Sequence, residues 1–123
     1  MPHLVLEYSD NMADHPDFQQ LFNSIHLTLE KTGHFKIADI KSRAVKHDTY
    51  LIGNGEPDRS FVTINLAILS GRTDEFKKNL SAQLLEILKH HFPITINSQK
   101  SSITVQISEI HQPSYRKLTG PGY

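Results

Sequence analysis

The hydrophobic pattern of the chain changes its period twice in the same order, and this repeat restricts the fold more than any other feature. In each half, a segment with apolar residues at every second position precedes one with apolar residues three and four positions apart, and a second extended segment follows. A period of two indicates a strand, and a period near 3.6 indicates an amphipathic helix. We therefore expect two strand-helix-strand units with a break near residue 56.

The first unit covers about residues 2–52. Its opening strand, residues 3–8, places three apolar side chains on one face, namely Leu4, Leu6 and Tyr8. Asp14 is expected to cap the following helix, and Gly33 is expected to end it. That helix has a continuous apolar stripe, formed by Phe18, Leu21, Phe22, Ile25 and Leu29. An extended segment over residues 40–52 completes the unit.

The second unit covers about residues 60–110. Its first strand, residues 61–69, carries alternating apolar side chains at Val62, Ile64, Leu66 and Ile68. Thr73 is a predicted N-cap and Pro93 a predicted stop for a helix with its own apolar stripe. The stripe consists of Phe76, Leu80, Leu84, Ile87 and Leu88. A last strand over residues 102–110 buries one face, at Ile103, Val105 and Ile107.

These elements predict one α+β domain spanning residues 1–123. Both helices are long enough for right-handed crossovers between parallel strands, which predicts a four-stranded sheet with two helices packed on one face. Residues 111–123 contain several prolines and glycines and are expected to form a tail. A ferredoxin-like domain has a similar set of elements, and their order alone does not distinguish the two folds.

Composition excludes several classes of partner. Thirteen Lys and Arg residues balance thirteen Asp and Glu residues, so the surface lacks the excess positive charge that nucleic acid requires. The longest apolar run has four residues, 66–69, and no membrane span is expected. The chain has no cysteine and no recognisable signal sequence, which we interpret as a cytoplasmic protein. Its modest apolar content, 37%, favours oligomer formation as additional stabilisation.

Common catalytic motifs are absent. The sequence has no nucleophile elbow, no glycine-rich phosphate loop and no His-Glu-x-x-His pair. The adjacent His90 and His91 would point about 100° apart on a helix, which does not suit the chelation of one ion. We therefore expect no metal site.

Pro2 is the residue that most suggests chemistry. When Met1 is removed after synthesis, which a small second residue permits, Pro2 presents a secondary amine at the start of a strand. An α-amino group ordinarily titrates at ~7.7–8.0, and apolar surroundings or nearby cations lower its pKa. Such an amine can act as a general base near neutral pH. From this residue alone, the alternative remains that the proline only stiffens the start of the chain.

Three cations are candidate substrate ligands. Arg72 lies between Gly71 and the expected cap of the second helix, close to unpaired amide donors and the positive helix end. Lys41 and Arg43 are two residues apart and share one face of the second strand. Such a set can bind an anion, and the alternative for each residue is a solvated surface charge.

Several motifs occur in an order that resembles one known family. They are Pro2-His3-Leu4-Val5 with Glu7, Ser9-Asp10-Asn11, Thr32-Gly33, Ile40-Lys41-Ser42-Arg43, Phe61-Val62 and Gly71-Arg72. The sequence resembles 5-carboxymethyl-2-hydroxymuconate delta-isomerases of the tautomerase superfamily. The similarity runs in order from residue 2 to about residue 110. The joint spacing is far more specific than any single motif.

The resemblance implies a tautomerase-type fold and a homotrimer with pockets built partly from neighbouring subunits. It implies a 1,3-proton shift in a small polycarboxylate of the muconate type, during bacterial breakdown of homoprotocatechuate, without a cofactor. Pro2 would be the base, Arg72 would match the family's Gly-Arg motif, and Arg43 the second arginine of an Ile-Arg-Ser-Arg pattern. Lys41 departs from that pattern: it keeps the charge but loses the planar fork suited to a carboxylate.

Three alternatives stay open at this point. One is a non-catalytic trimeric binding protein on the same fold, which a retained Met1 would favour. Another is a tautomerase that acts on a different enol or on an unsaturated acid. The third is a monomeric ferredoxin-like regulatory domain.

Overall fold

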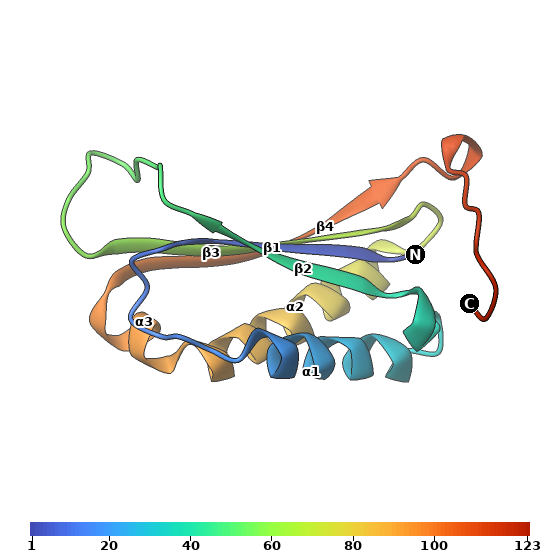
Figure 1. The fold of residues 1–123 in the computed structure, drawn as a ribbon, viewed down its shortest axis with the longest axis horizontal. Helices are drawn as coiled ribbons and strands as arrows, with labels where there is room; N and C mark the ends of the chain where they lie inside the picture. Colours follow the sequence, from blue (N-terminus) through green and yellow to red (C-terminus); the bar gives the residue numbers. More distant parts are fainter.

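In the computed structural model, which describes residues 1–123, four strands form one mixed sheet in the order β2-β1-β3-β4 (Figure 1). β1 (His3–Ser9) is parallel to β2 (Lys41–His47) and antiparallel to β3 (Arg59–Leu69), which is parallel to β4 (Lys100–Ile110). Each strand-helix-strand unit therefore contributes one pair of adjacent parallel strands. This order excludes the ferredoxin-like alternative, in which a third strand splits such a pair.

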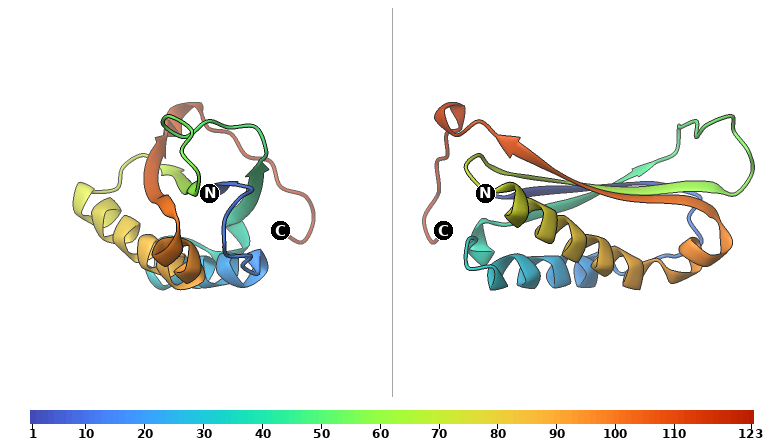
Figure 2. Two further views of the ribbon diagram at one scale, coloured as in Figure 1. Left: turned by 90° about the vertical axis from the view of Figure 1, so that its left-hand side faces the viewer. Right: turned by 180° about the vertical axis from the view of Figure 1, so that it is seen from behind.

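Two long helices cover the same face of the sheet, as expected (Figure 2). α1 (Phe18–Lys31) connects β1 to β2, and α2 (Asp74–His91) connects β3 to β4. Their apolar stripes and the inward-facing side chains of the sheet supply most of one core of 16 buried residues, to which Met12, Ile40 and Phe92 also belong. The opposite face of the sheet carries no helix. None of the helices combines the length and the hydropathy that a membrane crossing demands.

The predicted alternation of the strands is confirmed. In β3 every second side chain is buried, and the four apolar ones are Val62, Ile64, Leu66 and Ile68. In β4 the side chains of Ile103, Val105 and Ile107 are partly buried and pack against the core. Thr73 caps α2 as predicted, since its hydroxyl oxygen accepts the amide of Phe76 at 3.1 Å.

The start of α1 differs from the prediction. Asp17 is the N-cap, with its carboxylate accepting the amides of Gln19 and Gln20. Asp14 is buried and accepts the backbone amide of Thr95 at 2.6 Å. That amide belongs to α3 (Pro93–Ser98), a short helix which the sequence did not predict. The expected role of Asp14 as the cap of α1 was therefore wrong, because the chain brings this carboxylate to another helix.

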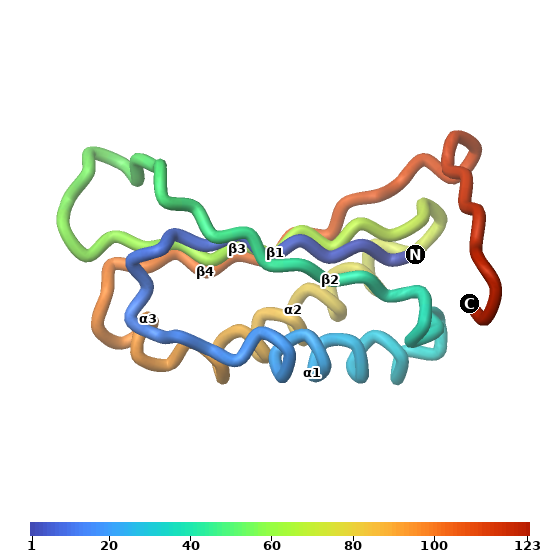
Figure 3. The backbone as a smooth tube through the Cα atoms, viewed as in Figure 1, coloured from blue at the N-terminus to red at the C-terminus, as the bar shows by residue number.

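The second strand is also shorter than predicted. Residues 40–52 were expected to be extended, but β2 ends at His47, and a short 3-10 helix, η1 (Ile37–Asp39), precedes it. The physical reason is the length of β1, whose last residue, Ser9, pairs with His47. Beyond that point no strand partner remains, and the chain forms a loop that extends past the sheet (Figure 3).

Candidate active site

Pro2 and Lys41 lie side by side at one end of the sheet, where β1 and β2 begin and β3 ends. His3 pairs with Lys41 on one side and with Ala67 on the other. One residue earlier, the carbonyl oxygen of Pro2 accepts the backbone amide of Lys41 at 3.2 Å. Pro2 is buried, and it immediately precedes β1 at the end of the sheet where β2 also starts. The structure thus brings two of the four predicted site residues into direct contact.

The free amine at the chain start lies in a partly buried, cationic environment. It belongs to Met1 in this structure and lies 3.4 Å from the carbonyl oxygen of Asp39. Burial lowers its pKa from the ordinary value, Lys41 and Lys117 lower the pKa further, and Asp39 opposes them. An amine with a lowered pKa is neutral over a wider pH range and can accept a proton near neutrality.

Lys41 is held in place from two directions. Its ammonium donates to the carbonyl oxygen of Asp39 at 2.9 Å and to the hydroxyl of Tyr123. The amine of Met1 and the ammonium of Lys41 therefore share one acceptor. Lys41 is thereby brought close to the amine, where its positive charge disfavours protonation of the amine and lowers the pKa of that group.

His3 and Arg43 extend the site along the face of the sheet that the helices leave open. The Nδ1 atom of His3 is buried and has no hydrogen-bond partner. Burial lowers the pKa of His3, and Arg43, the chain-terminal amine and Lys41 lower it further. Arg43 is itself exposed. Lys41 and Arg43 therefore make this corner of the sheet positive, which suits an anionic ligand.

Arg72 lies at the same end of the molecule but on the side of the helices. It follows Gly71, whose φ of 113° favours glycine in the turn between β3 and α2. The Arg72 guanidinium lies 3.1 Å from Nδ1 of His34 and 5.8 Å from the ring centres of Phe35 and Phe76. No hydrogen bond or ion pair joins it to the other three predicted site residues. The geometry therefore presents Arg72 as a separate, exposed cation at the end of the site.

Three residues at this end were missed by the sequence analysis. The carboxylate of Asp39 accepts Lys117 at 2.7 Å, and Tyr123 contacts Lys41. The partners in these contacts are 78 and 82 residues apart in the chain. No local sequence pattern predicts these contacts. The presence of a lysine and a tyrosine in the tail was the only feature that could have suggested them. Residues 111–123 are thus partly fixed against the site.

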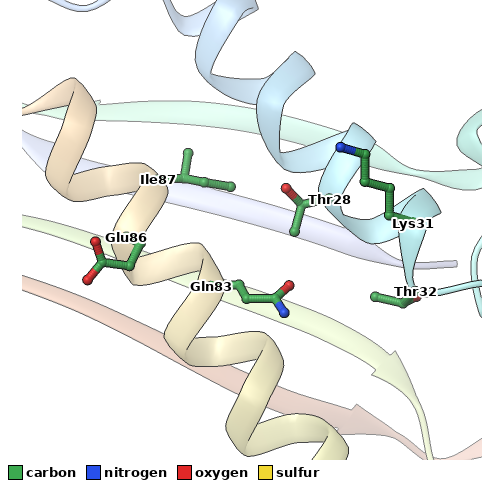
Figure 4. A pocket seen from close by; sticks show the side chains of 6 residues that line it. All are labelled: Thr28, Lys31, Thr32, Gln83, Glu86 and Ile87. Atoms are coloured by element: carbon green, nitrogen blue, oxygen red, sulfur yellow. The ribbon is translucent and has the colours of Figure 1, made fainter.

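A sizeable depression elsewhere does not match this chemistry. It encloses about 450 Å³ on the outer surface between α1 and α2. Figure 4 shows its six lining side chains, which come from both helices and the end of α1. None of the predicted site residues is among them, and only one, Ile87, is hydrophobic. We therefore place the candidate active site at the end of the sheet. No group of three or more potential metal-ligating side chains is found.

Comparisons with known proteins show the family of the chain. The family model for 5-carboxymethyl-2-hydroxymuconate isomerase matches residues 2–119. A 5-carboxymethyl-2-hydroxymuconate Delta-isomerase of Escherichia coli is 34% identical over 111 residues, which cover 90% of this chain and 88% of that protein. The family model thus includes every strand from β1 to β4.

Solved structures show the same fold. A 5-carboxymethyl-2-hydroxymuconate isomerase from Deinococcus radiodurans R1 superposes with a TM-score of 0.88 at 29% identity, covering 97% of this chain and 90% of that one. A symmetric trimer of fused 4-OT superposes with a TM-score of 0.65 at 16% identity, covering 96% and 93%. The fold is thus the α+β fold of the tautomerases. With a family model that matches nearly its full length, this chain belongs to the 5-carboxymethyl-2-hydroxymuconate isomerase family.

Proposed function

We propose that the protein is a cofactor-independent isomerase that catalyses a 1,3-proton shift in a substrate of the 5-carboxymethyl-2-hydroxymuconate type. The proposed role is in the degradation of aromatic compounds through homoprotocatechuate. Family membership supports the reaction class. The observation that carries the proposal is the partly buried amine at the chain start, whose pKa is lowered by burial and by two lysines.

Pro2 is the proposed general base, once Met1 has been removed. Its secondary amine takes a proton from one end of the conjugated system and returns it at the other, so atoms and charge balance over the cycle. A peptide-bonded proline cannot do this, because resonance withdraws the nitrogen lone pair. The contact between Pro2 and Lys41 keeps a positive group beside the new terminal amine, and the pKa of that amine is expected to be lowered as well.

Lys41, Arg43 and Arg72 are the proposed substrate ligands. A muconate-type substrate carries several carboxylates, and its enolate-like transition state has additional negative charge on oxygen. Cations that face this charge stabilise the transition state more than the ground state. Lys41 is closest to the base, Arg43 extends the positive face, and Arg72 can contact the anionic end of a substrate lying across the end of the sheet.

The active form is proposed to be a homotrimer. Both outer strands of the sheet, β2 and β4, have an unpaired edge, and one sheet face lacks covering helices. Unpaired edges of this kind readily accept strands from another chain. A structurally similar chain is described as a symmetric trimer. Neighbouring subunits would then complete each site, in which Arg43 and Arg72 are exposed in the single chain.

The test compares two forms of the protein, each verified by mass. One starts at Pro2, and the other retains Met1. Both are assayed near neutral pH with a 2-hydroxymuconate-type substrate. We expect both forms to fold and assemble and only the Pro2 form to be active. Equal activity would remove Pro2 as the base, and an inactive Pro2 form that still binds the substrate would support the non-catalytic binding protein instead.

A further inference from the structure

We propose that two residues of the C-terminal segment hold Lys41 in place: Lys117 anchors the segment to Asp39, and Tyr123 is a positioning residue for Lys41. The role of Lys41 in substrate binding rests on the proposed function, whereas the placement of the segment rests on contacts in this chain. Figures 1 and 2 show the two chain ends at the same end of the molecule, where the tail passes from β4 toward η1.

An ion pair anchors the segment. Lys117 donates to the carboxylate of Asp39 at 2.7 Å, and the two side chains are 34% and 24% exposed. The hydrogen bond from Lys117 holds the pKa of Asp39 below its ordinary value, and the bond to Asp39 raises the pKa of Lys117. Both groups therefore stay charged over the neutral range. Asp39 immediately precedes Ile40 and β2, so this anchor ties the tail to the strand that carries Lys41.

Tyr123 then contacts Lys41 in two ways. Its hydroxyl oxygen accepts the Lys41 ammonium, and the ammonium lies 5.0 Å from the centre of the tyrosine ring. The same ring lies 4.6 Å from the ammonium of Lys117. Tyr123 thus lies between the anchor and Lys41. A lysine side chain on an exposed strand end would otherwise sample many rotamers, so these contacts reduce the entropy lost when it binds an anion.

The position of Lys41 affects the chain start directly. Besides burial, three charged groups act on the terminal amine of Met1, the residue next to Pro2: Lys41 from β2, Asp39 from η1 and Lys117 from the tail. Lys41 is the larger of the two cationic influences. Release of Lys41 into solvent would move its charge away from the amine, and the pKa of the amine would then rise. The tail therefore acts on the proposed base in two ways: directly through the charge of Lys117, and indirectly through the position of Lys41.

The experiment uses the full chain starting at Pro2 and three variants in the tail. Tyr123→Ala removes both contacts with Lys41. Tyr123→Phe keeps the ring and removes the hydroxyl. Leu118→Ala is the matched control, since Leu118 lies in the same segment and is 99% exposed. Two quantities are measured for each: the pKa of the terminal amine, from NMR titration of ¹⁵N-labelled proline, and kcat and KM as functions of pH.

We expect Tyr123→Ala to raise the pKa of the amine and to raise KM about two- to tenfold, the usual value of one hydrogen bond. Its kcat should change less than KM at high pH, where the amine is neutral in every variant. Tyr123→Phe should recover part of both changes, and Leu118→Ala should match the parent protein. If Tyr123→Ala has the same amine pKa and the same KM as Leu118→Ala, the proposal is wrong.

A second variant tests the anchor. Lys117→Gln removes the ion pair with Asp39 and also a charge that acts directly on the amine, so KM is the quantity that tests the anchor. KM should rise as in Tyr123→Ala, and an unchanged KM would contradict the anchoring role. The two proposals can fail separately. If the parent protein does not turn over the substrate, the isomerase assignment fails while the amine titrations still decide the role of the tail. If the parent is active and no tail variant changes the titration, only the positioning role fails.

Discussion

The backbone amide of Lys41 donates a hydrogen bond to the carbonyl oxygen of Pro2 at 3.2 Å, which joins the start of β2 to the residue before β1. The contact continues the parallel ladder, in which His3 pairs with Lys41. A cation on β2 is therefore kept beside the chain start by main-chain geometry. Because this contact uses only the main chain, substitution of the Lys41 side chain should leave the strand in place. The effects of charge and of side-chain shape at this position can therefore be tested separately.

Lys41→Ala should lower kcat/KM about 10- to 100-fold, because a charged hydrogen-bond donor to a substrate carboxylate is lost. Lys41→Arg should retain most of the activity or exceed it, because arginine can bind a carboxylate with two parallel bonds. Steady-state kinetics of both variants check this. A large loss in Lys41→Arg would mean that the substrate differs from the family's muconate type.

Arg72→Ala should lower kcat/KM by about 10²–10³-fold if its guanidinium stabilises developing negative charge. Stability should fall only by about 0.5–1 kcal/mol, from the lost contacts with the rings of Phe35 and Phe76. Circular dichroism and urea unfolding control for folding, and Arg72→Lys separates charge from shape. Wild-type activity in a well-folded Arg72→Ala would show that the assigned role is wrong.

The assembly should sediment at about three times the chain mass of 14.0 kDa. The physical reason is the pair of unpaired strand edges and the uncovered sheet face. Sedimentation equilibrium at micromolar concentration measures this mass directly. A stable monomer would contradict both the trimer and the pocket shared between subunits.

Stability should fall as the pH drops below about 6.5, the unperturbed value for histidine. Burial lowers the pKa of His26, whose Nε2 lies 2.7 Å from the hydroxyl of Ser42. The unfolded chain therefore binds a proton on His26 more readily than the folded chain does. The contribution of His26 to stability is complete above pH 6.5 and is lost as the pH falls from 6.5 to the lower pKa of the folded state. Urea unfolding at pH 7.5 and 5.5 should show a smaller difference in His26→Gln than in the parent. The exposed His90→Gln is the control, and an identical pH difference in His26→Gln and His90→Gln would contradict the prediction.

Asp14→Ala should reduce the free energy of unfolding by about 1–3 kcal/mol, because buried amides lose their acceptor. The carboxylate accepts Thr95 at 2.6 Å and Ile94 at 3.4 Å. Asp48→Ala, on the exposed loop, should change stability by less than about 0.5 kcal/mol. Chemical denaturation compares the two variants. Equal values would mean that α3 does not depend on this cap.

Local sequence patterns were sufficient for the existence and order of the four strands and the two long helices. Alternation identified the buried face of β3, and helical spacing identified the stripe of α2 that ends at Leu88. Both signals depend only on residues within one element, because an element buries one face whatever covers it. For the same reason Lys41 and Arg43 could be assigned to one side of β2, and Pro2 to the start of β1.

Only the tertiary structure showed which segments and side chains of the chain contact one another. The strand order, the length of β2 and the use of Asp14 by α3 all depend on which segments the chain brings together. The contacts of Asp39 with Lys117 and of Lys41 with Tyr123 likewise join residues about two thirds of the chain apart. Periodicity predicts which face of an element is buried and which is exposed, but it does not identify the distant residue that a side chain will contact. The amino-acid sequence therefore determined the layers and pointed to Pro2 as a candidate base, and the folded chain determined which charges surround the chain start.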